Sequence, residues 1–240
     1  MNTPFSLDRQ TILVTGAAGG IGYAVAAAVA KQGARVVLCD HRPIDDAKLQ
    51  AIGPAATAAV CDVTSRSAVA DIRKAHPHVD GLVLAAGILP FDNWMDDDWD
   101  GSFDRVMAVN VRGSINLVRA YFPDMCERKR GRIVFVGSAS GRMGGMQAGP
   151  HYAASKGAVH SLVRWYAQRA APLGVCVNGV APGSIATDML DGQPFDTSRV
   201  PMRRMGTGEE VAWPIAFLCS AAAGYMNGAV IDINGGLVFS

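Results

Sequence analysis

The sequence has little charge and no excess of either sign. Lysine and arginine together number 22 and aspartate and glutamate 21, so the 240-residue chain has a formal net charge of +1. This balance leaves no electrostatic footprint for nucleic acid or for an anionic membrane surface, and we expect neither as a partner. Half of the residues are hydrophobic, which excludes a disordered chain.

Cysteine is also scarce. The five cysteines are far apart, odd in number and never spaced Cys-x-x-Cys; they are Cys39, Cys61, Cys126, Cys176 and Cys219. A disulfide framework and a zinc site are therefore not expected.

One long uncharged run, from Gln10 to Ala30, needs to be checked as a possible membrane span. It is long enough to span a bilayer, but four glycines interrupt its middle and no basic signal-peptide start precedes it. We interpret the run as a strand, a glycine turn and a buried helix, and we expect a cytoplasmic protein.

Short apolar runs alternate with longer helical patterns along the chain. The predicted strands are 11–15, 35–39, 57–61, 81–86, 132–136, 175–180 and 229–233. The predicted helices are 20–32, 65–75, 99–126 with an interruption at Pro123, 151–171, and one that starts at the capping box Thr207–Glu210. This alternation predicts an α/β fold: a doubly wound parallel sheet of about seven strands with helices on both faces. We expect a single domain over 1–240, with an irregular segment at about 183–206 that serves as a lid.

The glycine turn Thr15–Gly22 follows the first strand and opens the first helix. Residues without a side chain allow a tight turn there, so that the backbone and the helix N-terminus can approach a pyrophosphate. Asp40 ends the second strand, where an acid can bind both ribose hydroxyls of NAD and repel the extra phosphate of NADP. Asp40 can alternatively cap the next turn, and the neighbouring Arg42 can meet a 2′-phosphate, but we favour NAD over NADP.

Tyr152 and Lys156 lie four residues apart on a predicted helix, about 6 Å along its axis and on one face. A free phenol has a pKa of about 10, and a nearby ammonium lowers that pKa, which would make Tyr152 a usable general acid/base. Ser138 ends the fifth strand, at the sheet edge where ligands of such folds bind, and its hydroxyl is either a substrate contact or a turn cap.

These motifs, in this order, resemble those of the short-chain dehydrogenase/reductase superfamily. The resemblance runs from about Leu7 to Gly236; besides the motifs above, it includes Asp62-Val63, Ala86-Gly87, Val109-Asn110, Gly137-Ser138, Asn178, Pro182-Gly183 with Thr187, and Asp232–Gly236. It implies a Rossmann fold with the catalytic residues Asn110, Ser138, Tyr152 and Lys156. In this scheme Lys156 also binds the nicotinamide ribose, and Asn110 holds a helix backbone carbonyl and a water in a proton relay.

The resemblance also implies a set of coenzyme-binding residues. They are Gly16, Gly19, Gly20, Ile21, Gly22, Asp40, Asp62, Val63, Ala86, Gly87, Tyr152, Lys156, Pro182, Gly183, Ile185 and Thr187. The chain departs from the family after the fourth strand, where Ala85-Ala86-Gly87 replaces the usual Asn-Asn-Ala-Gly. We expect the missing amides to weaken local sheet hydrogen bonding rather than the chemistry.

We therefore expect an NAD(H)-dependent oxidoreductase that acts on a secondary alcohol or ketone. An NADPH-dependent 3-oxoacyl-carrier-protein reductase and a catalytically silent dinucleotide-binding sensor or scaffold are the alternatives. Family members usually form tetramers, so a homotetramer is implied. His151 either faces the substrate or is a surface or first-turn residue. Five methionines either flank the mouth of the site or belong to the core: Met143, Met146, Met189, Met202 and Met205.

Overall fold

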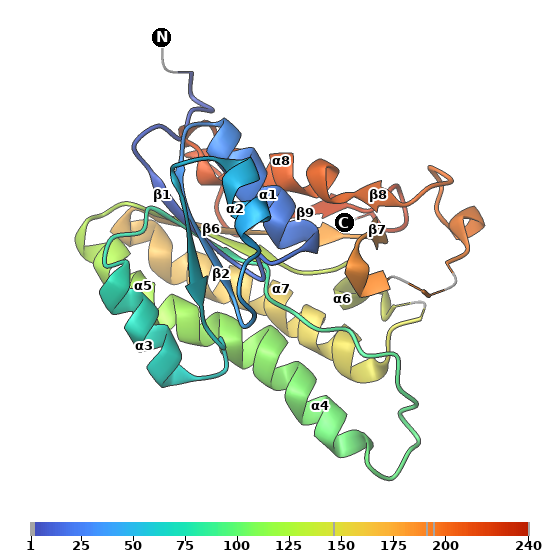
Figure 1. The fold of residues 1–240 in the computed structure, drawn as a ribbon. Helices are drawn as coiled ribbons and strands as arrows, with labels where there is room; N and C mark the ends of the chain where they lie inside the picture. The colour runs from blue at the N-terminus through green and yellow to red at the C-terminus, as the bar shows by residue number, and fades with distance from the viewer. Residues whose placement is uncertain (1–2, 146, 191, 194, 240) are drawn as a thin grey trace.

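The computed structural model describes residues 3–145, 147–190, 192–193 and 195–239. Seven parallel strands form one sheet in the order β3-β2-β1-β4-β5-β6-β9 (Figure 1). The strands are β1 (Thr11–Thr15), β2 (Arg35–Asp40), β3 (Ala56–Val60), β4 (Gly81–Leu84), β5 (Gly131–Val136), β6 (Val175–Pro182) and β9 (Val230–Ile233). The predicted doubly wound parallel sheet is therefore confirmed.

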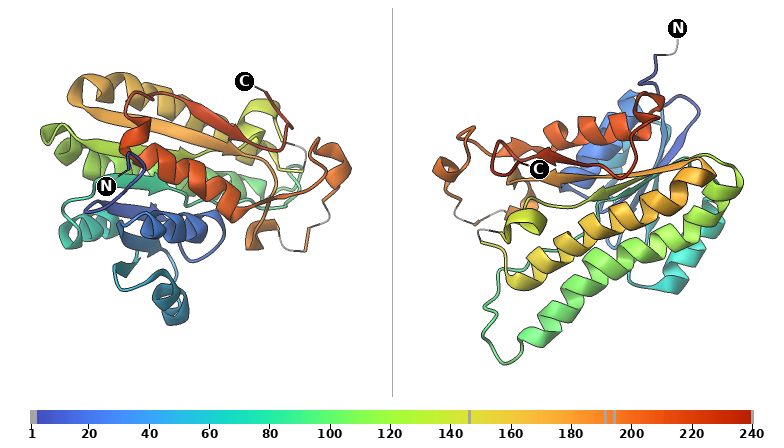
Figure 2. Two further views of the ribbon diagram at one scale, coloured as in Figure 1. Left: turned by 90° about the horizontal axis from the view of Figure 1, so that it is seen from above. Right: turned by 180° about the vertical axis from the view of Figure 1, so that it is seen from behind.

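Helices cover both faces of this sheet (Figure 2). Helices α1 and α8 pack on each other over one face, and α3, α5 and α7 lie over the other. The longer helices are α1 (Gly20–Lys31), α3 (Arg66–Ala75), α4 (Trp99–Met107), α5 (Ser114–Glu127), α7 (Pro150–Ala170) and α8 (Gly208–Cys219). Each face therefore has its own apolar core, as a sheet buried on both sides requires.

The local signals at the ends of two helices are confirmed. The first helix stops before Gly33, which adopts the left-handed conformation with φ +94°. At the start of α8, Thr207 Oγ1 accepts the Glu210 amide hydrogen and Glu210 accepts that of Thr207, so the capping box is complete.

The predicted interruption at Pro123 is wrong. Helix α5 continues through Pro123 to Glu127, and the irregularity lies earlier, in the π-helix η1 (Ala108–Gly113). Within it, the side chain of Asn110 bonds to the backbone of Ile88, which follows β4. Single π turns often occur at functional sites, and this one turns Asn110 towards the sheet edge.

Strand β4 ends at Leu84, two residues earlier than predicted. The amides of Ala85 and Ala86 each donate to Thr15 Oγ1 at 3.1 Å, instead of continuing the ladder. The hydroxyl of Thr15 thus supplies the acceptor for these two backbone amides just beyond the end of the strand.

The remaining described elements are short, and they include four 3₁₀ helices: η2 (Ala171–Leu173), η3 (Asp188–Leu190), η4 (Thr197–Arg199) and η5 (Ala221–Ala223). Helix α2 (Asp46–Ile52), which the sequence did not predict, buries none of its residues. Helix α6 (Ser140–Met143) follows β5. In the segment 183–206, β7 (Ile185–Ala186) pairs in parallel with β8 (Gly206–Thr207). Among the described helices, we find none with both the length and the apolar character needed to cross a membrane.

Candidate active site

The glycine turn between β1 and α1 is too crowded for side chains. A Cβ at Gly22 would lie 2.1 Å from the Gly16 carbonyl oxygen, and one at Gly16 would lie 2.9 Å from the backbone of Ala86. Gly16 and Gly20 also have positive φ angles of +68° and +52°. The backbone cradle that a dinucleotide pyrophosphate requires is therefore present at the N-terminus of α1.

Asp40 lies at the end of β2, beside this cradle, and is 5% exposed. Its carboxylate accepts hydrogen bonds from the amides of Ala18, in the glycine turn, at 3.0 Å and of Arg42 at 3.1 Å. The turn-capping alternative is therefore real, but each carboxylate oxygen has further acceptor capacity for a ribose hydroxyl. His41 and Arg42 are both about two-thirds exposed next to it.

Ser138, Tyr152 and Lys156 come together at the carboxyl edge of β5. Tyr152 and Lys156 lie in α7 and are 8% and 6% exposed, and Ser138 is also 8% exposed. The Ser138 hydroxyl accepts the Ser140 amide at 3.1 Å, a turn contact that also orients the hydroxyl. The predicted helical spacing therefore brings the phenol and the amine to one buried face.

The electrostatic expectation for this pair is not met in the structure. Burial raises the pKa of Tyr152, and a hydrogen bond with Ser138 opposes that rise only in part. The amine of Lys156 donates to the Val136 carbonyl at 2.9 Å and lies 5.6 Å from the centre of the Tyr152 ring. Burial also lowers the pKa of Lys156 to about 8, so this amine loses its proton more readily than an exposed lysine does.

Asn110 is 1% exposed and holds the segment that follows β4. Its amide oxygen accepts from the Ile88 amide at 2.8 Å, and its amide nitrogen donates to the Ile88 carbonyl at 3.1 Å and to Ser155 Oγ at 3.0 Å. The expected contact with a helix carbonyl is indirect, because Ser155 Oγ in turn donates to the Tyr152 carbonyl at 2.8 Å. Asn110 therefore connects the sheet edge to the turn of α7 that bears Tyr152.

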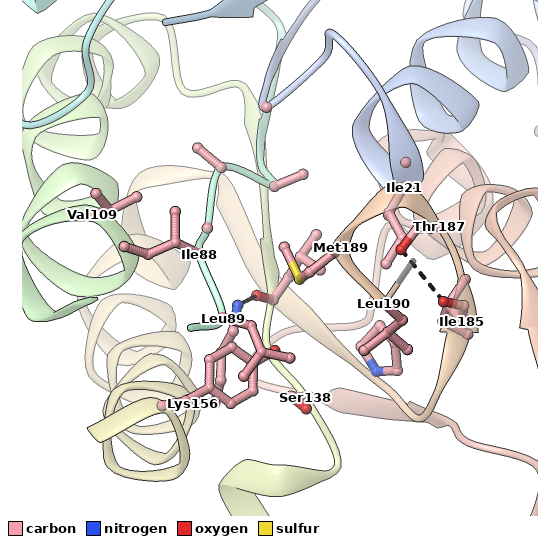
Figure 3. Close-up of a pocket in the computed structure, with 18 of the residues that line it drawn as sticks. Ile21, Ile88, Leu89, Val109, Ser138, Lys156, Ile185, Thr187, Met189 and Leu190 are labelled. Atoms are coloured by element: carbon pink, nitrogen blue, oxygen red, sulfur yellow. Dashed lines mark hydrogen bonds between the residues drawn. The ribbon is translucent and has the colours of Figure 1, made fainter. Parts of the chain in front are cut away.

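One cavity of about 1130 Å³ contains the glycine turn at one end and Ser138, Tyr152 and Lys156 in its wall. Every expected coenzyme-binding residue lines this cavity. Of the four expected catalytic residues, Ser138, Tyr152 and Lys156 line it and Asn110 does not. In Figure 3, Thr187 and Ile185 lie on one side of the cavity, joined by a hydrogen bond, and Ile88 and Val109 lie on the other. A Cβ at Gly20 would be 3.5 Å from Thr187 and one at Gly19 would be 3.3 Å from Asp188, so these two residues face the glycine turn.

The cavity extends beyond the expected coenzyme residues, and sequence reasoning missed most of this extension. Its further lining residues include Leu89, Pro90, Phe91, Arg105, Phe195 and Leu237. Of the predicted methionines, Met143 and Met189 line it, Met202 lines a separate cavity of about 370 Å³, and Met146 is outside the described residues. The apolar type of these residues is equally typical of a core, so no sequence signal distinguishes them.

His151 is placed in the first turn of α7, as expected, but the expectation of a surface position is wrong. Its side chain is 0% exposed, and it does not line the cavity. It packs against the Trp99 ring, with 5.0 Å between ring centres. The described residues include no group of three or more histidine, cysteine, aspartate or glutamate side chains placed to hold a metal ion.

Known proteins resemble this chain over nearly its whole length. A family profile described as enoyl-(acyl carrier protein) reductase matches residues 16–238. Galactitol 2-dehydrogenase (L-tagatose-forming) of Cereibacter sphaeroides is 40% identical, over 98% of this chain and 97% of the relative.

Two solved structures share the fold and the sequence pattern. A putative NAD(P)-dependent gluconate 5-dehydrogenase from Beutenbergia cavernae, with NADP bound at low occupancy, has a TM-score of 0.92 and 33% identity over 98% of this chain and 99% of its own. A 3-oxoacyl-[acyl-carrier protein] reductase from Brucella melitensis, with bound NAD, has a TM-score of 0.89 and 32% identity over 100% of this chain and 94% of its own. The protein therefore belongs to the short-chain dehydrogenase/reductase superfamily, whose oxidoreductases act on alcohol or ketone groups with a nicotinamide dinucleotide.

Proposed function

We propose that the protein is an NAD(H)-dependent oxidoreductase that interconverts a secondary alcohol and a ketone. The observation that carries this proposal is the convergence of Ser138, Tyr152 and Lys156 on the cavity that also contains the glycine cradle. When bound, the nicotinamide supplies or accepts the hydride. The rest of the chemistry is a proton transfer and the positioning of one substrate oxygen.

In this proposal, the Ser138 hydroxyl binds the substrate oxygen and the Tyr152 phenol exchanges a proton with it. Burial raises the pKa of Tyr152, so at neutral pH the phenol is protonated and ready to donate to a ketone oxygen. In the direction of alcohol oxidation the same group must accept a proton, and a cationic Lys156 favours that form. Asn110 keeps the turn of α7 that bears Tyr152 in place through Ser155.

The proposed test of the mechanism is the substitution Tyr152→Phe. Turnover of a panel of alcohols and ketones, followed through the absorbance of the reduced coenzyme, should fall by about 10³-fold, within the range of general acid–base catalysis. Coenzyme affinity, measured by fluorescence titration, should stay within about twofold, because the ring still fills its place. Full turnover by the variant would contradict the mechanism. No turnover by the parent on any substrate would favour the catalytically silent sensor or scaffold.

The preference for NAD over NADP is proposed from Asp40, whose carboxylate is buried beside the cradle and repels a 2′-phosphate. The substitution Asp40→Asn keeps an acceptor for the Ala18 amide and removes the charge. We expect it to shift the ratio of kcat/KM for the two coenzymes at least tenfold towards NADP. An unchanged ratio would reject this role for Asp40.

One observation favours the alternative, an NADPH-dependent 3-oxoacyl-carrier-protein reductase. His41 and Arg42 are exposed beside Asp40 and can meet a 2′-phosphate. A chain from Aggregatibacter actinomycetemcomitans named 3-oxoacyl-[acyl-carrier-protein] reductase is also 36% identical to this one. Reduction of a 3-oxoacyl thioester with NADPH, faster than any reaction with NAD, would establish that alternative.

The remaining proposals concern the whole molecule. We propose that residues 1–240 act as a single catalytic domain in the cytoplasm, that the segment 183–206 closes over the substrate, and that four copies associate. Trp165 on α7 and Phe239 near the C-terminus are 50% and 88% exposed, which is compatible with burial between subunits. Sedimentation that shows only monomer would refute the tetramer.

A further inference from the structure

His151 is a buried titratable group that the proposed chemistry does not use. Its side chain is 0% exposed, although it directly precedes Tyr152. Neither of its ring nitrogens has a hydrogen-bond partner among the described residues. A buried imidazole without a hydrogen bond is costly, and the close approach of the Asp92 carboxylate is what can offset that cost.

Contacts on several sides fix the position of the imidazole. The Trp99 ring of α4 lies against it, and a Cβ at Gly149 would be 2.6 Å from its Cε1 atom. On another side, its Nε2 atom is 3.4 Å from an oxygen of Asp92, in the segment between β4 and α4. The ring therefore has little freedom to move away from that carboxylate.

Asp92 is held from both sides. Its other oxygen accepts a short hydrogen bond from the hydroxyl of Ser102, which is buried in α4. Burial raises the pKa of Asp92, but the Ser102 hydrogen bond and the charge of His151 outweigh burial and lower it overall. Asp92 therefore stays ionised and joins the β4–α4 segment to both α4 and the start of α7.

The residues just before Asp92 form a wall of the cavity. Leu89, Pro90 and Phe91 all line it, and they directly follow Ile88, which lines the same cavity. A shift of Asp92 would move this wall relative to Tyr152, because only one residue separates Asp92 from Pro90.

We propose that His151 is a positioning residue that, through Asp92, sets the distance between the substrate wall Leu89–Phe91 and the catalytic Tyr152. The expected change in KM rests on the proposed function. The wall Leu89–Phe91 would contact the substrate, whereas Tyr152 would transfer the proton. Loss of the contact between His151 and Asp92 should weaken substrate binding, while the rate of the catalysed step and the coenzyme affinity stay unchanged.

Two substitutions at position 151 separate positioning from packing. His151→Phe keeps a ring against Trp99 but has no nitrogen for Asp92, whereas His151→Gln keeps a nitrogen donor and loses the ring. We expect KM for the alcohol or ketone to rise about tenfold in His151→Phe and to stay within about threefold in His151→Gln. In both variants kcat should stay within threefold and the coenzyme dissociation constant within twofold. A wild-type KM in His151→Phe would show that the ring is only packing and would overturn the proposal.

Asp92→Asn tests the partner side, with Asp97→Asn, an exposed acid of the same segment, as the matched control. Asp92→Asn should raise KM about as much as His151→Phe, the double variant should be no worse than either single one, and Asp97→Asn should change nothing. If the two effects multiplied in the double variant, the residues would act separately and the proposal would fail.

Hydrogen exchange of the amides in 86–95 provides a reading that needs no enzymatic activity. Exchange there should accelerate in His151→Phe and Asp92→Asn and not in Asp97→Asn. If exchange accelerates in the variants but the wild-type protein turns over no substrate, the positioning role of His151 is supported and the proposed function is rejected. If exchange is unchanged in the variants and the wild-type protein is active, the positioning role is rejected and the proposed function is supported.

Discussion

The two ends of the cavity are built in different ways. At the coenzyme end, the fit is between backbone atoms: a Cβ at Gly22 or Gly16 would meet main-chain atoms within 3 Å. At the substrate end, the wall consists of side chains that are partly open to solvent, such as Met143 at 40% exposure and Met189 at 44%. A fit between backbones admits few residue types, whereas a wall of side chains can change one residue at a time. The coenzyme end can therefore be predicted from a sequence, whereas the substrate end cannot.

The largest effect that this contrast predicts is that of Gly22→Ala. The added methyl would overlap the Gly16 carbonyl oxygen, and no flexible side chain can yield to relieve the contact. We expect a loss of more than about 3 kcal/mol in the free energy of unfolding, at the upper end for overpacking. Coenzyme affinity should fall at least 100-fold. Urea unfolding and fluorescence titration measure these two quantities.

Gly101→Ala is the matched control for that substitution. Gly101 lies in α4, and a Cβ there would meet no atom within 4 Å. Alanine should stabilise the helix by about 0.5–1 kcal/mol and leave coenzyme affinity unchanged. If Gly22→Ala and Gly101→Ala changed stability and coenzyme affinity alike, steric crowding would not explain the need for glycine at position 22.

Thr15→Val is the next test of the coenzyme end. The Thr15 hydroxyl is buried and accepts two amide hydrogens, from Ala85 and Ala86, at 3.1 Å each. Valine has nearly the same shape but leaves both amides without that acceptor, which should cost about 2–3 kcal/mol in thermal or urea unfolding. Thr15→Ser keeps the hydroxyl and should cost less than about 1 kcal/mol. A wild-type stability in Thr15→Val would show that the two hydrogen bonds do not contribute and would contradict this prediction.

His160 lies in α7, next to the backbone of Ser138 in the wall of the cavity. Its Nε2 atom accepts weakly from the Ser138 amide at 3.5 Å. Burial lowers the pKa of His160 to about 4, with help from the charges of Arg142, Arg164 and Lys156. The unfolded chain, in which this pKa is about 6.5, therefore binds the proton more readily than the folded one.

The neutral imidazole thus contributes stability that is fully present above about pH 6.5 and is lost as the pH falls towards 4. Urea unfolding at pH 7 and at pH 4.5 should show that the wild-type protein loses about 2 kcal/mol more than His160→Gln, which has no group that titrates in this range. A pH slope that persists unchanged in His160→Gln would contradict the assignment.

The sequence predicted the sheet, most of the helices and the position of the glycine turn because these depend on local patterns. The run Thr11–Thr15 is apolar throughout because both of its faces are covered, and the glycines must follow it directly. The spacing of Tyr152 and Lys156 likewise follows from the pitch of one helix. Each of these inferences needs only residues that are close in the sequence.

Apart from the missed helix α2, the errors involve contacts between distant segments. The π turn at Asn110 depends on Ile88, and the burial of His151 depends on Asp92 and Trp99. The amine of Lys156 is directed to a carbonyl of β5 instead of to the phenol, which helix spacing alone does not reveal. The cavity lining beyond the coenzyme residues draws on Leu89, Phe195 and Leu237, which only the folded chain brings together.

The smallest effect on stability is expected at the substrate end, in Met189→Ala. Met189 is 44% exposed, so its truncation should change the free energy of unfolding by less than about 0.5 kcal/mol. Its side chain nevertheless lines the cavity, and its loss should raise KM for an apolar ketone severalfold while coenzyme affinity stays constant. Met202→Ala is the control, because Met202 is 60% exposed and lines the separate, smaller cavity. If Met189→Ala weakened coenzyme binding as much as substrate binding, the two ends would share their determinants and the contrast between them would not hold.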